Sequence, residues 1–157
     1  MKPSVYLETT IVSYLTARPA KDLVLAAKIS TTRDWWEERR SDFDLFVSDT
    51  VYTEVAAGDS EAARLRLDAI SDIARLTLSQ DAKDLAKDLL TGIPLPIHAG
   101  ADALHLAIAA VNGLDFLLTW NCRHLANAAL RHRIEYLCHQ AGFQPPMICT
   151  PLELMER

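Results

Sequence analysis

The chain has 157 residues, of which 50% are apolar and 24% charged, and its 16 Lys and Arg against 21 Asp and Glu give a formal net charge of −5 at pH 7. A chain of this length and composition can bury a core of its own, which excludes a disulfide scaffold and an intrinsically disordered protein. The negative charge also argues against a protein that binds nucleic acid by bulk electrostatic attraction, because such domains are usually basic.

The cysteines and the distribution of apolar residues indicate a cellular compartment. Cys122, Cys138 and Cys149 are an odd number without C-x-x-C spacing, which favours reduced, buried, inert thiols over a bridged secreted fold. No apolar run approaches the roughly 18–20 residues that a transmembrane helix needs. Glu8 interrupts the stretch that would be apolar in a signal peptide. The sequence therefore predicts a cytoplasmic protein that does not associate with a membrane.

Short β-prone stretches alternate with amphipathic helical patterns along the chain. In order, the pattern predicts a strand at 4–7, a helix that runs through 11–15 after its cap, one or two helices between 23 and 40, a strand at 44–47, helices at 49–57 and 59–70, a strand at 74–78, helices at 82–90 and 99–112, a strand at 115–119, a helix at 126–140, a strand at 147–149 and a short helix from Pro151. This alternation predicts an α/β fold in which a central parallel sheet is flanked by helices on both faces. We expect a single domain over residues 1–157 with a helical insertion at about 21–41.

Local signals support several of these boundaries. Thr9-Thr10 and Ser48-Asp49 are suited to cap the helices that follow them. Pro19 is expected to close the first helix, and Gly58 and Gly113 are expected to end two later ones.

Acidic and amide side chains stand where the predicted strands end. Glu8 follows the first strand, Asp49 and Glu54 follow the second, and Asn121 follows the fourth. Sites in open parallel sheets form at the carboxyl ends of the strands. Asp102 lies in the first turn of an otherwise apolar helix, where an inward-facing carboxylate needs a partner. Several acids at one sheet edge would repel each other without a cation, and oxygen ligands suit Mg²⁺ or Mn²⁺.

Each of these residues also has a structural interpretation. Glu8 could be a chance acid at a strand end, and Glu54 could lie on the solvated face of its helix. Asp102 could interact with the helix dipole, and Asn121 could cap the helix that follows it. Thr119 and His124 bracket Asn121, and either could orient a phosphate or a water molecule.

Several other classes of site are excluded because their sequence motifs are absent. The five glycines form neither a P-loop nor a G-x-G-x-x-G turn, and the chain has no G-x-S-x-G or H-E-x-x-H motif. The last lysine is Lys87, which disfavours a receiver domain, since that fold needs a lysine after its last strand. We interpret the remaining histidines as ordinary surface or core-edge residues without zinc-ligand spacing: His98, His105, His132 and His139.

Four blocks of sequence resemble PIN domains, the small metal-dependent ribonucleases known as the toxins of VapBC-type toxin–antitoxin pairs. Their order and spacing match from residue 5 to about 152, and the blocks are Tyr6-Leu-Glu-Thr-Thr-Ile-Val-Ser-Tyr-Leu15, Ser48-Asp-Thr-Val-Tyr-Thr-Glu-Val55, Ala101-Asp-Ala-Leu-His-Leu-Ala107 and Asp115-Phe-Leu-Leu-Thr-Trp-Asn121. The resemblance implies a central parallel sheet, flanking helices and an acidic cluster that binds Mg²⁺ or Mn²⁺.

The resemblance assigns catalytic and metal-binding roles to four residues. Glu8 takes the place of the first acid, which is usually Asp, and Glu54 and Asp102 match the second and third. Asn121 stands where a fourth acid, often Asp, is usual. The longer Glu8 and the neutral Asn121 depart from the family pattern, and the three acids would still carry three negative charges.

The implied function is a metal-dependent endoribonuclease that hydrolyses phosphodiester bonds of single-stranded or structured RNA, as the toxin of a toxin–antitoxin pair. The implied partners are a small antitoxin and a second copy of the chain in a homodimer. A catalytically degenerate PIN-like module that binds RNA or protein is the alternative. We expect five residues to contact substrate: Thr9, Thr10, Thr119, Arg123 and His124.

Basic and aromatic residues supply candidate contact surfaces. A basic strip, defined as Arg123, His124, Arg131, His132 and Arg133, could follow an RNA backbone or simply be a solvated helix face. Further candidates are Arg18, Arg33, Arg39 and Arg40. Of the neighbours Trp35 and Trp36, we expect one in the core and the other in a partner interface.

Overall fold

A five-stranded sheet forms the centre of the computed structural model, which describes residues 1–93 and 100–156. The strands lie in the order β3-β2-β1-β4-β5 and all adjacent pairs are parallel. Their bounds are β1 Ser4–Leu7, β2 Asp44–Ser48, β3 Ala74–Leu76, β4 Phe116–Leu118 and β5 Met147–Cys149. The predicted parallel sheet is confirmed.

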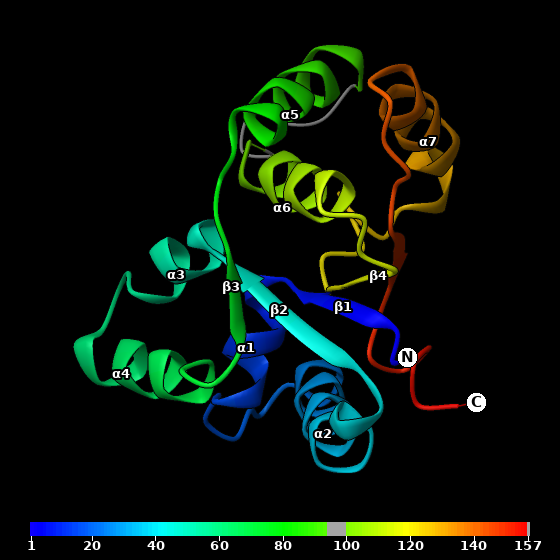
Figure 1. Cartoon of the computed structure of the whole chain (residues 1–157). Helices are drawn as coiled ribbons and strands as arrows, with labels where there is room; N and C mark the ends of the chain where they lie inside the picture. The colour runs from blue at the N-terminus through cyan, green and yellow to red at the C-terminus, as the bar shows by residue number, and fades with distance from the viewer. Residues whose placement is uncertain (94–99, 157) are drawn as a thin grey trace.

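Helices cover both faces of this sheet (Figure 1). Helices α5, α6 and α7 lie on one face, α1, α2 and α4 lie on the other, and α3 follows the end of β2. Their bounds are α1 Thr9–Leu15, α2 Leu23–Glu38, α3 Asp49–Val55, α4 Ser60–Ala69, α5 Gln80–Gly92, α6 Gly100–Val111 and α7 Arg131–Gln140, with short 3-10 helices η1 at Arg40–Asp42 and η3 at Ala128–Leu130. The expected α/β architecture with two helical layers is confirmed.

The strand order places β1 in the middle of the sheet, paired with β2 on one side and β4 on the other. From β1 the chain runs outward through β2 and β3, and then returns to the opposite side of β1 for β4 and β5. The carboxyl ends of β1 and β4 therefore meet where the winding direction changes, which is the usual location of a site in such sheets. Glu8 and Thr119 directly follow these two strands.

The central strands are apolar on both faces, as a sheet with two helical covers requires. Val5, Tyr6 and Leu7 of β1 and Leu117 and Leu118 of β4 are fully buried. Trp35 of α2 is also fully buried and packs against Phe43, whereas its neighbour Trp36 is partly exposed under the guanidinium of Arg40. The prediction that one of the two tryptophans lies in the core is confirmed for Trp35.

Two predicted boundaries in the first half of the chain are wrong. Glu8, and not Thr9 or Thr10, is the N-cap of α1, since its side chain accepts a hydrogen bond from the backbone of Thr10. This helix ends at Leu15 with Thr16 as C-cap, well before Pro19. The predicted helical stretch at 21–41 contains α2 and the start of η1, and its description as an insertion stays a prediction.

Two predicted helices in the second half are shorter or absent. The segment before Arg131 forms turns and η3, so α7 begins five residues later than the expected start at Ala126. Residues 151–155 form turns in place of a C-terminal helix. The expected break in regular structure at 92–96 falls mainly on residues outside those described, as does residue 99, the predicted start of the helix observed as α6.

Among the described residues, no helix is both long enough and apolar enough to cross a membrane.

The three cysteines are free and occupy two kinds of environment. Cys138 and Cys149 are buried, as expected, but Cys122 is exposed, so the prediction of buried thiols is wrong at that position. Burial raises the pKa of Cys138 to about 11 and that of Cys149 to about 12. Because the thiolate is the reactive form, Cys122 is the residue available to a thiol reagent.

We predict that a chromogenic thiol reagent at pH 8 modifies one cysteine per folded chain rapidly, and all three after denaturation. The Cys122→Ser variant should lose the fast phase and keep the two slow thiols. Fast reaction of two or three thiols in the folded wild-type protein would contradict the burial of Cys138 and Cys149.

Candidate active site

Glu8 is a buried carboxylate at the carboxyl end of β1, with only 4% of its surface exposed. Its Oε1 accepts hydrogen bonds from the hydroxyl groups of Thr10 and Thr119, and its Oε2 accepts the backbone N–H of Thr10 at 3.1 Å. Thr10 in turn accepts the backbone N–H of Trp120. The same carboxylate therefore caps α1 and connects the ends of β1 and β4.

Asp102 is the second buried carboxylate, 8% exposed, in the first turn of α6. Its Oδ1 accepts the Nδ2–H of Asn121 at 2.9 Å, and its Oδ2 lies 2.8 Å from Nδ1 of His124. Asn121 also accepts the backbone N–H of His124 and donates its own backbone N–H to Thr119. The loop after β4 thus holds Asp102 and Glu8 in one hydrogen-bonded network.

Glu54 on α3 is the third carboxylate and is partly exposed. Its Oε1 accepts the hydroxyl of Thr9 at 2.7 Å and is hydrogen-bonded to Nε2 of His105. Burial acts to raise the pKa of Glu54, but the hydrogen bonds from His105 and Thr9 outweigh it, so the pKa lies below its ordinary value. Glu54 is therefore held in its charged form.

A buried polar chain lies behind Glu54. His105, which is fully buried on α6, has its Nδ1 2.6 Å from the hydroxyl of Tyr6, and that hydroxyl lies 2.6 Å from Oγ of Ser48. Burial raises the pKa of the Tyr6 phenol far above its ordinary value, which keeps its proton in place. Ser48 also accepts the backbone N–H of Val51 as the N-cap of α3.

These contacts bring three predicted acids to one edge of the sheet, where their partners include two histidines but neither Lys nor Arg of the described residues. Glu54 is joined to the segment of Glu8 through Thr9, and Glu8 is joined to Asp102 through Thr119 and Asn121. Within residues 1–93 and 100–156, neither Lys nor Arg forms an ion pair with Glu8, Glu54 or Asp102. Buried charge without a cationic partner is costly, so the arrangement suits a cation.

The three carboxylates are not oriented toward a common metal position in this structure. Across the part of the chain that the structure describes, no three His, Cys, Asp or Glu side chains are arranged to hold a metal ion together. Each acid faces its own protein donors. The donor chemistry, with three carboxylates and no soft ligand, fits a hard divalent cation, whose binding would require these side chains to exchange part of their hydrogen bonds.

Asn121 presents its amide N–H, and not its carbonyl oxygen, to Asp102. The carbonyl oxygen Oδ1 is used inside the loop, where it accepts the backbone N–H of His124. This orientation lets Asn121 hold Asp102 in place, and direct coordination by Asn121 would require its amide to leave the loop.

The other residues expected near substrate lie at or beside these acids. The hydroxyl groups of Thr9, Thr10 and Thr119 all donate to the acids of the site, and Arg123 is exposed on the loop beside it. Asp49, also predicted at this edge, is hydrogen-bonded to Arg75 in place of joining the site.

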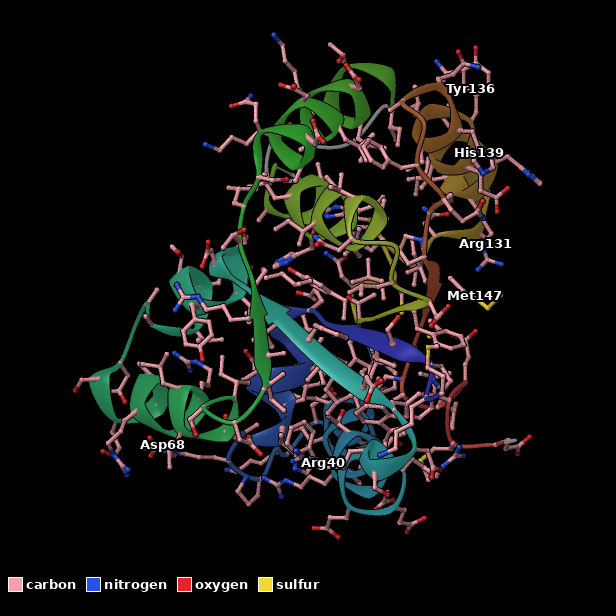
Figure 2. The ribbon with its side chains drawn as sticks, viewed as in Figure 1. Arg40, Asp68, Arg131, Tyr136, His139 and Met147 are labelled. Carbon is pink, nitrogen blue, oxygen red and sulfur yellow. The ribbon has the colours of Figure 1, made fainter. Side chains whose placement is uncertain are left out.

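The predicted basic strip is divided by the fold. His124 points to Asp102, whereas Arg131 lies on the outer side of α7 (Figure 2) and Arg133 donates to the carbonyl of Gly92. Three of the further candidates make structural contacts instead: Arg33 with the carbonyls of Leu15 and Ala17, Arg39 with Asp42 and the carbonyl of Met155, and Arg40 with Asp72 and Trp36.

Sequence reasoning missed His105, Tyr6 and Ser48 as residues of this region. His105 was expected at the surface or the core edge, and that interpretation is wrong because the side chain is fully buried. The available signal was its position one helical turn after Asp102, which places both side chains on the same face of α6.

Comparison with solved structures supports the fold inferred above. VapBC2 from Rickettsia felis, solved bound to a DNA fragment from their promoter, is similar with a TM-score of 0.59 and 15% identity over 94% of this chain and 98% of that one. The sarcin–ricin loop cleaving toxin VapC20 from Mycobacterium tuberculosis is similar with a TM-score of 0.60 and 16% identity over 79% of this chain and 95% of that one. No family model and no curated protein matches the sequence. The chain thus has the fold of VapC-like PIN domains, and the fold expected from the resemblance is confirmed.

We predict that Thr119→Val destabilises the protein by about 1–3 kcal/mol, because it leaves the backbone N–H of Asn121 without its acceptor and removes one donor from Glu8. Urea unfolding of both proteins measures this difference. Thr91→Val is the matched control, since that exposed hydroxyl bonds only to carbonyl groups of its own helix. Equal losses in the two variants would refute the structural role of Thr119.

Proposed function

We propose that the protein is a metal-dependent endoribonuclease that hydrolyses phosphodiester bonds in RNA. The observation that carries the proposal is the set of three carboxylates, two of them buried, that have no Lys or Arg partner among the described residues. They lie at the switch point of a sheet whose fold is that of VapC toxins.

Glu8, Glu54 and Asp102 would hold Mg²⁺ or Mn²⁺, and Asn121 would act mainly by fixing Asp102. When bound, such an ion would lower the pKa of a water molecule and neutralise charge that develops on the phosphate. The protein's own contribution is to keep the carboxylates charged and oriented. Thr9, Thr10 and Thr119 serve this purpose through the hydroxyl groups that they donate to Glu54 and Glu8.

The substrate contacts belong to the loop after β4. Arg123 is exposed there and can bind a phosphate of the RNA backbone. His124, which is partly buried against Asp102, would contact the phosphate that is cleaved. Because VapC20 is described as a sarcin–ricin loop cleaving toxin, a structured RNA is included among the substrates that we propose.

The likeness to VapBC2 supports a role as the toxin of a toxin–antitoxin pair, with a small antitoxin as partner. We also propose a homodimer, as the family resemblance implies. Light scattering would test the dimer, and a short neighbouring reading frame that encodes a DNA-binding protein would support the antitoxin.

A second candidate function is a non-catalytic module that binds RNA or protein. It is favoured by the fact that each acid already has hydrogen-bond donors and that the described residues hold no ready-made metal cluster. Metal binding therefore distinguishes the two functions.

We predict that Asp102→Asn lowers Mg²⁺-dependent cleavage of single-stranded RNA on the order of 100-fold or more, because the variant removes one charged ligand while keeping the side chain's shape. Cleavage of a labelled RNA, with and without a chelator, measures the effect. Asp68→Asn, a change at an exposed carboxylate on α4 (Figure 2), is the control and should cleave like wild type. Undiminished cleavage by Asp102→Asn would sink the proposal.

We also predict that the wild-type protein takes up Mn²⁺ in a calorimeter and that the Glu8→Ala, Asp102→Ala double variant does not. The physical reason is the loss of two of the three negative charges that the ion would neutralise. Absence of uptake by the wild type, or uptake unchanged in the double variant, would favour the binding module.

A further inference from the structure

We propose that His105 is a positioning residue, held in its Nε2–H tautomer by the Tyr6–Ser48 hydroxyl pair so that it orients the carboxylate of Glu54. The proposal rests on the assignment of Glu54 to the metal site. It concerns residues that neither the sequence patterns nor the comparisons assign to that site.

The first step in the argument is the direction of each hydrogen bond. A charged carboxylate can only accept, so Nε2 of His105 must carry the proton that it shares with Glu54. On the other side of the ring, Nδ1 faces the hydroxyl of Tyr6, which is fully buried and keeps its proton.

The second step is that only one direction of donation along the Ser48–Tyr6–His105 hydrogen bonds gives every hydroxyl proton an acceptor. Ser48 accepts the backbone N–H of Val51, and its own proton can go to Tyr6. Tyr6 can then donate to Nδ1 of His105. In the reverse direction Tyr6 would donate to Ser48, and the proton of Ser48 would be left without an acceptor among the described residues in a fully buried place.

The third step is that the four residues come from four different secondary-structure elements. Tyr6 is on β1, Ser48 ends β2, Glu54 is on α3 and His105 is on α6. Both nitrogens of the imidazole ring are bonded, so the ring cannot rotate without losing two contacts. Mutation of a residue that orients a metal ligand in this way typically lowers metal affinity by about 10- to 100-fold.

The tautomer can be measured in the metal-free protein. Nitrogen-15 NMR of the imidazole rings should show His105 with the proton on Nε2 and with Nδ1 as an acceptor, and Tyr6→Phe should shift the Nδ1 resonance because it removes the donor. A proton on Nδ1 of wild-type His105, or an Nδ1 resonance unmoved by Tyr6→Phe, would overturn the proposal. This measurement does not depend on nuclease activity or on metal uptake.

Two substitutions at His105 separate positioning from packing. The amide of Gln reaches the place of Nε2, and that of Asn reaches the place of Nδ1. His105→Gln should therefore keep Mn²⁺ affinity within about threefold of wild type, and His105→Asn should weaken it by about 10-fold or more in calorimetry. His139→Asn, at an exposed histidine on α7 (Figure 2), is the control and should leave the affinity unchanged.

Equal affinities in folded His105→Gln and His105→Asn variants, checked by thermal unfolding, would refute the positioning role. If neither variant folds, the NMR measurement on wild type and Tyr6→Phe decides the question. Absence of Mn²⁺ uptake by the wild type would count against the proposed nuclease, while the tautomer would still decide how His105 holds Glu54.

Discussion

The buried carboxylate of Glu8 is the interaction on which the rest of the site depends. It follows the central strand of the sheet, caps α1 through the backbone of Thr10 and receives the hydroxyl of Thr119 from the end of β4. A charge in this place is tolerated because three neutral donors surround it, yet no basic side chain of the described residues neutralises it. The same residue therefore supports the local structure and leaves the negative potential that a cation would compensate.

Much of the fold follows from local patterns in the sequence. The run Val5-Tyr6-Leu7 is apolar without alternation, which is typical of a strand covered on both faces, and its predicted bounds match β1. The order of strands and helices was also predictable because the turns between them are marked by capping residues such as Ser48.

The errors occurred where side chains compete with the regular hydrogen bonds of the backbone. The third strand stops at Leu76 because the carboxylate of Asp49, far away in the sequence, accepts the backbone N–H of Leu78. The helix expected from Ala126 starts late, and in the segment before it the side chain of Asn127 accepts the backbone N–H of Ala129. Such contacts depend on the tertiary structure, so a window of sequence does not reveal them.

Part of the site was equally accessible from the sequence. Glu8, Glu54, Asp102 and Asn121 could be selected from their positions after strands and in one apolar helix. The structure links Glu8, Asp102 and Asn121 through hydrogen bonds, and Glu54 bonds to Thr9, the residue that follows Glu8. The buried chain that ends at His105 could not be selected in this way, because its direction depends on which protons find acceptors in three dimensions.

The central position of β1 has a consequence for how the chain is made. Thr119 donates to Glu8 across 111 positions of sequence, and His105 meets Tyr6 across 99. Contacts of such separation form late, since the intervening chain must first be ordered. During synthesis on a ribosome, a chain whose β4 has not yet emerged would lack the loop that holds Asp102 in place. The acids of the candidate site would thus reach their observed arrangement only after the residues that follow β4 have folded.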